Sequence, residues 1–266
     1  MELFGIRTPI IRQGDNLVEI LSSAITQHGL ALKHRDILVL AETAVATAQG
    51  RIRRLSDVTV SSHAKRLSKK YQLEPELAQL VIDESEEILG GVPHVLLTIT
   101  SGILCANAGI DRSNAPPGYV VLLPEHPAKE AWRIKDHLES LANQELGIII
   151  ADSRTQPLRL GTVGLAVAVA GFEPVKDLRG QPDLYGRLLR ITRSAVADNL
   201  ASAAQVLLGE ANEQTPAVLI RGAPVHFTRE RISPSALTIP RHECLYFAIF
   251  EEWHHKHQPE QRTEPE

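Results

Sequence analysis

Acidic side chains stand at three points where this sequence could do chemistry on metals or phosphates. Asp152 and Ser153 follow the apolar run 148–150 after a single alanine, and Asp111 lies in a polar segment. Glu210 comes just after a long Ala-rich segment. Carboxylate and hydroxyl oxygens are hard ligands, which suit Mg²⁺ or Mn²⁺ better than Zn²⁺. If the three segments converge in space, they predict a site for a hard divalent cation.

Each of these acids also has a purely structural interpretation. A carboxylate at the end of a buried strand faces the sheet edge where ligands usually bind, but Asp152 could equally cap the turn that follows it. Asp111 belongs to a segment rich in turn-forming residues. Glu210 would stand at a helix end, where an acid is mildly unfavourable. Spacing alone does not show that the segments meet, so the sequence leaves both interpretations open.

Two other groups of metal-binding residue types are weaker candidates. His254, His255 and His257 lie in a polar tail, residues 251–266, that lacks an apolar period. We expect this tail to be disordered and assign the histidines no role, because nothing there would orient them as ligands. Cys105 stands in an apolar segment and is expected to be a small buried hydrophobe.

Charge and motif content exclude several classes of function. Lys and Arg total 28 against 32 Asp and Glu, a net charge of −4, which argues against general nucleic-acid binding. The basic run 63–70 is then a solvated helix face, or a surface that draws in an anionic substrate. The sequence contains no GxxxxGK[ST] phosphate loop, no GxGxxG fingerprint after a strand, no GxSxG elbow and no HExxH helix.

The cysteine content and the apolar stretches are typical of a cytoplasmic protein. The two cysteines, Cys105 and Cys244, form no disulfide framework, which favours a reducing compartment. The first residues include Glu2 and lack the apolar core of a signal peptide. The apolar stretches fall short of the roughly 20 residues that cross a bilayer. We therefore expect a cytoplasmic protein with no nucleic-acid or membrane partner.

The elements that must position the acids follow from apolar periodicity in a chain of 266 residues, 43% of them hydrophobic. Strands are predicted at 36–41, 94–100, 103–106, 119–123, 147–150, 163–170 and 217–221. Helices are predicted at 15–28 with Asp15 as cap, twice within 61–89 with Pro75 opening the second, and at 127–146 and 188–208. Residues 42–49 are expected to turn away from the first of these strands.

The order of these elements sets the expected fold class. Helices and strands mix without strict alternation, which predicts an α+β fold, a complex mixed α/β arrangement, rather than a doubly wound sheet. We expect a single domain over residues 1–250, followed by the polar tail.

Four collinear segments carry a family resemblance. They are CANAGIDRSN at 105–114, IIADS at 149–153 with Pro157, Arg159, Gly161 and Gly164 after it, the pair 202–210 and 216–222, and TPII at 8–11 with Gly14 and Asp15. Together these segments, from about residue 5 to 225, resemble the coenzyme F420-0:L-glutamate ligase family, which adds glutamate to a deazaflavin cofactor precursor.

The resemblance implies a set of site residues and cofactors. It aligns Asp111, Asp152, Ser153 and Glu210 with ligands of two Mg²⁺ or Mn²⁺ sites, although the family more often has Gln at the position of Glu210. It aligns the following residues with contacts to GTP, the co-substrate: Thr8, Pro9, Ile10, Ile11, Glu42, Thr43, Thr47, Asn114, Leu208, Gly209, Ala211 and Asn212. It also allows for K⁺, and it implies an intertwined homodimer with its active site near the subunit interface.

Three departures from the family pattern concern charge near the nucleotide. Glu42 replaces a serine, and Thr47 replaces the lysine expected to touch phosphate. Thr155 and Gln156 stand where the family has Gly-Arg, and Arg154 could stand in for the lost arginine. Loss of a cation and gain of an anion should weaken triphosphate binding unless another base compensates.

The activity that the resemblance implies is GTP-dependent amide ligation. The terminal carboxylate of F420-0 would attack the γ-phosphate to give an acyl phosphate, from which the amine of L-glutamate displaces phosphate, and further γ-linked glutamates could follow. The alternatives are an amide ligase for a different carboxylate acceptor and a non-catalytic relative that binds a nucleotide or metabolite. The sequence does not fix the acceptor, the number of glutamates added, or the choice between GTP and ATP.

Overall fold

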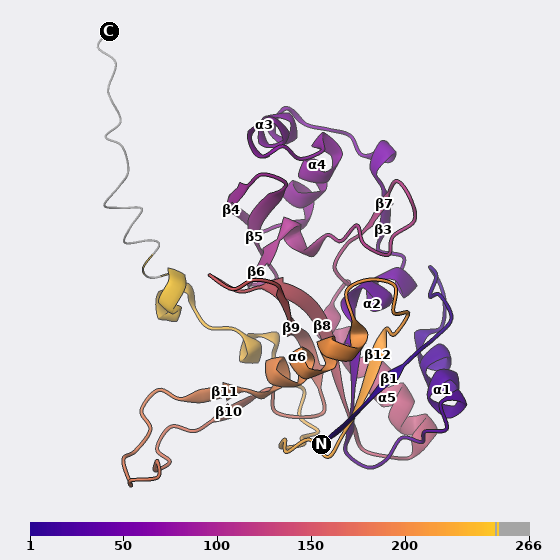
Figure 1. Ribbon diagram of the computed structural model, residues 1–266, viewed down its shortest axis with the longest axis vertical. Helices are drawn as coiled ribbons and strands as arrows, with labels where there is room; N and C mark the ends of the chain where they lie inside the picture. Colours follow the sequence, from indigo (N-terminus) through magenta and orange to yellow (C-terminus); the bar gives the residue numbers. More distant parts are fainter. Residues whose placement is uncertain (248, 250–266) are drawn as a thin grey trace.

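A five-stranded mixed sheet organises the larger part of the protein (Figure 1). The computed structural model describes residues 1–247 and residue 249. In spatial order the strands are β1 (Glu2–Ile6), β12 (Ala217–Arg221), β2 (Asp36–Ala41), β8 (Leu146–Thr155) and β9 (Thr162–Ala170). β2 and β8 run parallel, and the other neighbours are antiparallel. The predicted strands 36–41 and 217–221 are confirmed to the residue.

Helices cover both faces of this sheet. They are α1 (Leu17–Gln27) and α5 (Pro127–Ala142) on one face and α6 (Val196–Leu208) on the other. Every residue of β2 but the last is buried, as expected for a strand covered on both faces. α6 packs closely against β9 because Gly164 has no side chain: a Cβ there would lie 2.5 Å from the carbonyl oxygen of Ala201.

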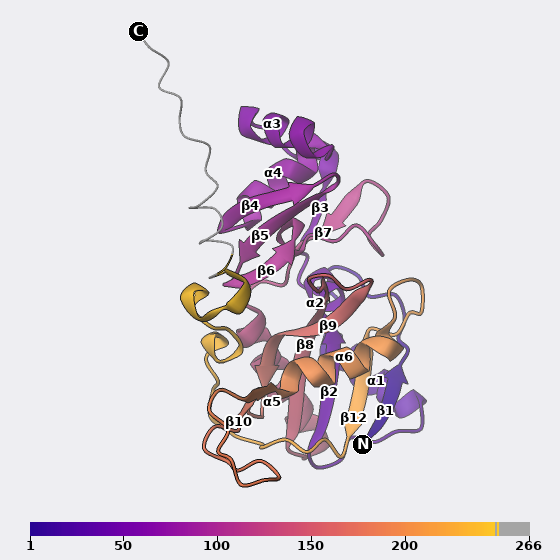
Figure 2. The ribbon, with the colours of Figure 1, turned by 60° about the vertical axis from the view of Figure 1, so that its left-hand side comes forward.

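The second part of the fold has its own apolar core and lies beyond one edge of the large sheet (Figure 2). It contains α3 (Ser62–Tyr71), α4 (Pro75–Glu84), the three-stranded sheet β4 (Glu87–Val92), β5 (Val95–Thr100) and β6 (Ile103–Ala106), and the pair β3 (Ile52–Arg54) and β7 (Tyr119–Val121). Two 3₁₀ turns, η1 (Leu55–Asp57) and η2 (Asn107–Gly109), complete it. Short segments join this part to the large sheet, among them α2 (Glu42–Ala48).

Two further features extend from the large sheet. The ribbon of β10 (Val175–Asp177) and β11 (Arg193–Ala195) carries a long loop that projects from the body as an arm (Figure 1). The chain after β12 passes through η3 (Pro234–Leu237) and η4 (Arg241–Glu243) and reaches the second part, where Arg241 forms an ion pair with Glu87 of β4.

The mixed α/β architecture is confirmed, and several predicted boundaries were wrong. The helix predicted at 188–208 begins at Val196, because residues 193–195 pair with β10 instead. Residues 42–49, expected to turn away, form α2, and the second helix of 61–89 ends at Glu84 because β4 follows it. Asn16 rather than Asp15 caps α1.

Some predictions lie beyond what the structure describes. The tail 251–266 with His254, His255 and His257 falls outside the described residues, and the domain boundary at residue 250 stays a prediction. Among the described helices, none combines the length and the apolar character needed to cross a bilayer.

Candidate active site

One row of cross-strand partners defines the edge of the large sheet where the predicted site residues gather. Ile6 pairs with Ala217, Ala217 with Leu40, and Leu40 with Ile150. All four side chains belong to one buried apolar cluster. The segments that leave this row therefore meet at one edge of the sheet: residues 7–11 after β1, the loop before β12, α2 after β2, and the second half of β8.

Glu42 and Asp152 come from the two central strands at this edge. Ala41 pairs with Ala151 at the last parallel position of β2 and β8, so the two acids follow at the same level. Glu42 opens α2, where the helix dipole favours a negative charge. It is almost completely buried, with 8% of its surface exposed. A predicted nucleotide contact is thus a buried neighbour of the predicted metal ligand.

Asp152 lies within a strand, which contradicts the interpretation of this residue as a turn cap. β8 does not end at Ile150, as predicted, but continues to Thr155 by pairing with β9 alone. Beyond Ala151, β9 is the one partner of β8 among the described strands of this sheet, because β2 ends at Ala41. The Asp152 carboxylate forms an ion pair with Arg154, two residues further along the same strand.

Asp111 reaches the edge from the second part of the fold. Asn107, Ala108 and Gly109 all have positive φ angles, which turn the chain sharply after β6. The Asp111 carboxylate accepts hydrogen bonds from the amide and the hydroxyl of Ser113, at 2.7 and 2.5 Å. Its role as a turn former is therefore confirmed, and this role fixes the direction of the carboxylate.

Glu210 follows the end of α6 and is exposed. Its Oε1 accepts hydrogen bonds from the hydroxyl of Thr162 at 2.8 Å and from the side-chain amide of Gln205 at 2.7 Å. These partners lie on β9 and α6, so they hold the carboxylate against the hairpin that β8 and β9 form.

The four carboxylates act on one another electrostatically. Burial raises the pKa of Glu42 well above its ordinary value, and the charges of Asp152 and Asp111 raise it further. Burial also raises the pKa of Asp152, to about 6; Arg154 and the backbone amide of Ser153 oppose this rise, and Asp111 and Glu210 add to it. Clustered acids with raised pKa values are typical of sites that bind cations or do chemistry.

The donor chemistry of this carboxylate cluster fits a hard divalent cation. All four side chains offer oxygen, which Mg²⁺ and Mn²⁺ prefer. Within the part of the chain that the structure describes, no three acidic, His or Cys side chains are arranged as a ready-made metal site. The cluster therefore fits a cation that brings other ligands with it, as Mg²⁺ does when it binds through one or two carboxylates and substrate phosphates.

Ser153 and Asp152 lie on opposite faces of β8. It pairs with Gly164, whose missing Cβ faces Ala201 of α6, so both residues belong to the α6 face of the sheet. Successive residues of a strand point to opposite faces, which separates the Ser153 hydroxyl from the Asp152 carboxylate. Its role as a metal ligand stays a prediction.

The structure brings two predicted nucleotide segments together. The side-chain amide of Gln214 donates to the carbonyl oxygen of Thr8 at 3.0 Å, and the Thr8 amide donates to the Gln214 carbonyl at 3.4 Å. These bonds join residues 8–11 to the loop 209–215, which contains the predicted contacts Gly209, Ala211 and Asn212. Both segments lie at the edge that carries Glu42. The predicted contact Leu208 is the last residue of α6 and is buried in the apolar core on the face of the sheet that α6 covers.

The remaining predicted nucleotide contacts lie on α2 and beside Asp111. Thr43 and Thr47 are four residues apart on α2, so they share one face of the helix, and both are half-buried. Asn114 is exposed and follows Asp111 by three residues, with a φ of 55°. The nucleotide role of all three stays a prediction.

Two features of the site were missed or misjudged from the sequence. Glu42 follows a buried strand, the same signal that singles out Asp152, but the sequence predicts it only as a nucleotide contact with an anion in place of a serine. Arg154 is the stand-in that the sequence offers for a lost phosphate-binding arginine. Its guanidinium is instead buried next to Asp152, with which it forms an ion pair.

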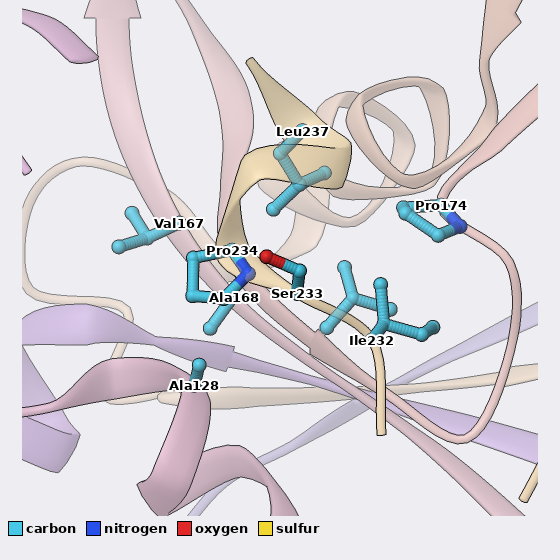
Figure 3. A pocket seen from close by; sticks show the side chains of 9 residues that line it. Ala128, Val167, Ala168, Pro174, Ile232, Ser233, Pro234 and Leu237 are labelled. Atoms are coloured by element: carbon cyan, nitrogen blue, oxygen red, sulfur yellow. The ribbon is translucent and has the colours of Figure 1, made fainter. Parts of the chain in front are cut away.

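A small apolar cavity lies away from this edge (Figure 3). Its lining comes from β9, the start of α5, Pro174 and the segment 232–237. Ser233 contributes a hydroxyl to the lining, and that hydroxyl shares a hydrogen bond with Ser235. None of the described residues that line this cavity is titratable, so the carboxylate cluster remains the candidate site.

The fold and the site together define a class of mixed α/β protein in which one sheet edge gathers acids suited to cation-assisted chemistry. A family model described as F420-0:Gamma-glutamyl ligase matches residues 5–222. The chain therefore belongs to the F420-0:gamma-glutamyl ligase family.

Curated relatives extend the match over most of the chain. A coenzyme F420:L-glutamate ligase of Methanothermobacter thermautotrophicus is 39% identical over 243 residues, which cover 91% of this chain and 96% of the relative. The protein of the same name from Methanopyrus kandleri is 39% identical over 213 residues, 80% of this chain and 82% of the relative. That of Methanococcus maripaludis is 38% identical over 231 residues, 86% and 90% of the two chains.

Proposed function

We propose that this protein is a GTP-dependent ligase that joins L-glutamate to the terminal carboxylate of coenzyme F420-0 through an amide bond. The observation that carries the proposal is the convergence of Glu42, Asp111, Asp152 and Glu210 at one sheet edge. This convergence occurs in a chain about 39% identical to proteins named coenzyme F420:L-glutamate ligase. Such relatives support the choice of acceptor and of amino acid.

The carboxylate cluster gives the site a use for divalent cations. Asp111, Asp152 and Glu210 would hold Mg²⁺ or Mn²⁺, with Glu42 behind them as a further negative charge and Ser153 as a predicted additional ligand. When bound there, the cation would neutralise the repulsion between an attacking carboxylate and a triphosphate. We propose two such sites for divalent cations, with K⁺ as a further candidate cofactor.

The proposed reaction has two steps. An oxygen of the acceptor carboxylate attacks the γ-phosphorus of GTP; the bond from that phosphorus to the β–γ bridging oxygen breaks, and GDP leaves. The amine of L-glutamate then attacks the carbonyl carbon of the acyl phosphate. The carbon–oxygen bond to phosphate breaks, inorganic phosphate leaves, and the nitrogen loses a proton to solvent or to a carboxylate. The protein's part is mainly to position the reactants, since phosphoryl transfer needs little covalent help.

The nucleotide would lie over the segments 8–11 and 209–215, close to Thr43, Thr47 and Asn114. The hydrogen bonds between Thr8 and Gln214 support this placement, because they join two predicted nucleotide segments into one surface. The burial of Glu42 supports a role for this residue with the carboxylates rather than against the phosphates.

A homodimer is part of the proposal. The arm between β10 and β11 exposes large apolar side chains: Leu184 is 99% exposed, Tyr185 84%, Leu188 64% and Ile191 86%. The loop projects from the body (Figure 1), so these side chains have no apolar core of their own to enter. Exposed apolar groups on a projecting arm support contact with a second copy of the chain.

The test is a mass-spectrometric assay of the purified full chain with F420-0, L-glutamate, GTP and Mn²⁺. We expect a product heavier than F420-0 by one glutamyl residue, or by several if γ-linked extension occurs, together with GDP. A parallel reaction with ATP measures nucleotide preference. If GTP is turned over with glutamate and another carboxylate but not with F420-0, the protein is an amide ligase for a different acceptor. Absence of both product and GDP would support a non-catalytic binding protein.

A further inference from the structure

Arg154 joins the two parts of the fold directly behind the carboxylate cluster. Its Nη1 donates to the carbonyl oxygen of Leu104 in β6 at 2.9 Å. Its Nε lies 3.6 Å from Oδ2 of Asp152, close enough for an ion pair but too far for a good hydrogen bond. The views in Figures 1 and 2 agree that β6 lies next to the ends of β8 and β9. The guanidinium therefore touches both the second part of the fold and the acid that β8 presents.

This guanidinium is buried with unmet hydrogen-bonding capacity. The side chain is 8% exposed, and within the described part of the chain Nε and Nη2 have no hydrogen-bond partner. An unmet buried donor costs free energy, more so when it is charged. Packing alone would favour an apolar residue of similar size at this position. The cost points to a function for the positive charge itself.

The charge of Arg154 acts on two acids, Asp152 of the carboxylate cluster and Asp198 of α6, and it lowers the pKa of each. Of these two acids, Asp152 is the one with which Arg154 forms an ion pair, so we consider its effect on the cluster. Among the described residues, Arg154 makes the one ion pair recorded for Glu42, Asp111, Asp152 or Glu210. Asp152 and Arg154 are two positions apart on a strand, so both side chains project from the same face of β8. The positive charge of Arg154 thus approaches Asp152 from within the protein.

The Arg154 guanidinium and an arriving divalent cation compete for the same carboxylate. Both are attracted to the Asp152 carboxylate, and they repel one another at short range in a poorly solvated environment. A divalent cation that arrives alone must overcome this repulsion. One that arrives with a triphosphate brings negative charge of its own, which offsets the charge of Arg154.

We propose that Arg154 is a positioning residue that holds Asp152 and, as a built-in counter-cation, weakens the binding of free divalent cations so that the metal enters with the nucleotide. This inference rests on the proposed function, because it assumes that the cluster binds a metal–nucleotide complex. It adds a regulatory element to that site, namely the order in which metal and nucleotide bind.

The test compares Mn²⁺ binding to the full-length protein by isothermal titration calorimetry, without nucleotide and with a non-hydrolysable GTP analogue. Arg154→Gln removes the charge and keeps a polar group, Arg154→Met removes the charge and leaves no unmet donor, and Arg154→Lys keeps the charge. Arg133→Gln is the matched control, since Arg133 pairs with Glu130 on α5, away from the cluster.

We expect Arg154→Gln and Arg154→Met to bind Mn²⁺ about tenfold more tightly than wild type without nucleotide. This gain should shrink when the analogue is present, and kcat should fall in both variants because Asp152 loses its partner. Arg154→Lys and Arg133→Gln should bind free Mn²⁺ as wild type does. A merely structural role for Arg154 predicts the opposite sign, since a loosened site binds metal more weakly.

The outcomes separate the two proposals. Suppose that the wild type binds Mn²⁺ and ligates glutamate, but that Arg154→Gln or Arg154→Met, whichever folds, binds Mn²⁺ no more tightly than wild type. This result overturns the role of Arg154 and leaves the proposed ligase function intact. Absence of Mn²⁺ binding by wild type, with and without the nucleotide analogue, overturns both this role and the metal-assisted ligase. The methionine variant keeps the test decisive if the glutamine variant fails to fold.

Discussion

Glu42 and Asp152 stand at matching positions beyond the last parallel pair of β2 and β8, the pair formed by Ala41 and Ala151. Two acids that follow neighbouring parallel strands necessarily meet at one edge of a sheet, where ligands of α/β proteins usually bind. Burial raises the pKa values of both; the charge of Asp152 raises that of Glu42 further, and the charges of Asp111 and Glu210 raise that of Asp152. The geometry of the two strands, rather than any local motif, therefore creates the charge of this site.

Asp152→Asn separates the electrostatic role of Asp152 from its structural role. Asn keeps the size of Asp but carries no charge, so it relieves the repulsion within the cluster and weakens metal binding. We expect the variant to melt at or above the wild-type temperature without metal. Its Mn²⁺-induced melting shift should be small, and its ligase rate should fall by about 10²–10³-fold. Calorimetric melting curves with and without Mn²⁺, together with the ligase assay, measure these effects.

Asp83→Asn is the control for this experiment, because Asp83 is an exposed acid on α4. It should change neither the melting shift nor the rate. An Asp152→Asn protein with wild-type turnover and an undiminished Mn²⁺-induced shift would remove Asp152 from the site, and the proposed mechanism with it.

The stability of the metal-free protein should fall as the pH rises. The pKa of Asp152 in the folded protein is about 6, against 3.8 for an ordinary aspartate, and that of Glu42 is also raised. Between these values the folded state binds more protons than the unfolded state, so the free energy of unfolding decreases from about pH 4 to pH 6. Mn²⁺ binds the ionised form, so the metal-induced increase in melting temperature should grow as the pH passes 6.

Melting curves at several pH values, with Mn²⁺ or with EDTA, check this dependence, and Asp152→Asn should flatten it. A metal-free stability that rises steadily over the same range in wild type would contradict the raised pKa values.

The sequence was most informative where an element depends on its own residues. β2 and β12 were predicted to the residue because each is a short apolar run, and Pro75 marked the start of α4. The prediction of element boundaries failed where pairing with another strand determines the secondary structure. β8 extends past Ile150 because β9 pairs with it, and residues 193–195 become a strand because β10 lies beside them.

The same contrast applies to the site. Asp111, Asp152 and Glu210 could be singled out by type and position, but the sequence could not show that they act on one another, because they come from two parts of the fold. The burial of Arg154 against Leu104 and Asp152 depends on how these parts meet, so the sequence predicted only a replacement for a lost phosphate-binding arginine.

Ligase activity should depend strictly on a hard divalent cation. The candidate ligands are all oxygen atoms, which favour Mn²⁺ and Mg²⁺ over Zn²⁺. We expect exhaustive EDTA treatment to abolish product formation, Mn²⁺ or Mg²⁺ to restore it, and an equal concentration of Zn²⁺ to restore much less. Full activity after chelation, verified by elemental analysis of the treated protein, would contradict a role for the cluster in metal binding.

Thr47→Lys should improve the use of the nucleotide. Thr47 lies on the last turn of α2, half-buried and on the same face as Thr43. The family resemblance predicts a lysine at this position. An ammonium group there would add a charge-assisted contact to phosphate. We expect a lower KM for GTP with little change in kcat, measured in steady-state assays at saturating glutamate. An unchanged or higher KM, in a variant with wild-type melting, would mean that another group already binds the phosphates.

The arm between β10 and β11 should be necessary for dimer formation. Leu184 and Ile191 are almost fully exposed on it, and burying such side chains against a partner contributes about 1.5–3 kcal/mol each. We expect the double substitution Leu184→Ser and Ile191→Ser to weaken self-association at least about a hundredfold, as measured by sedimentation velocity over a dilution series. Leu141→Ser, which changes an exposed leucine on α5, is the matched control and should leave the sedimentation profile unchanged.

If the double variant still sediments as wild type does at every concentration, the arm is not the contact between subunits. If wild type itself sediments as a monomer, the proposed homodimer is wrong.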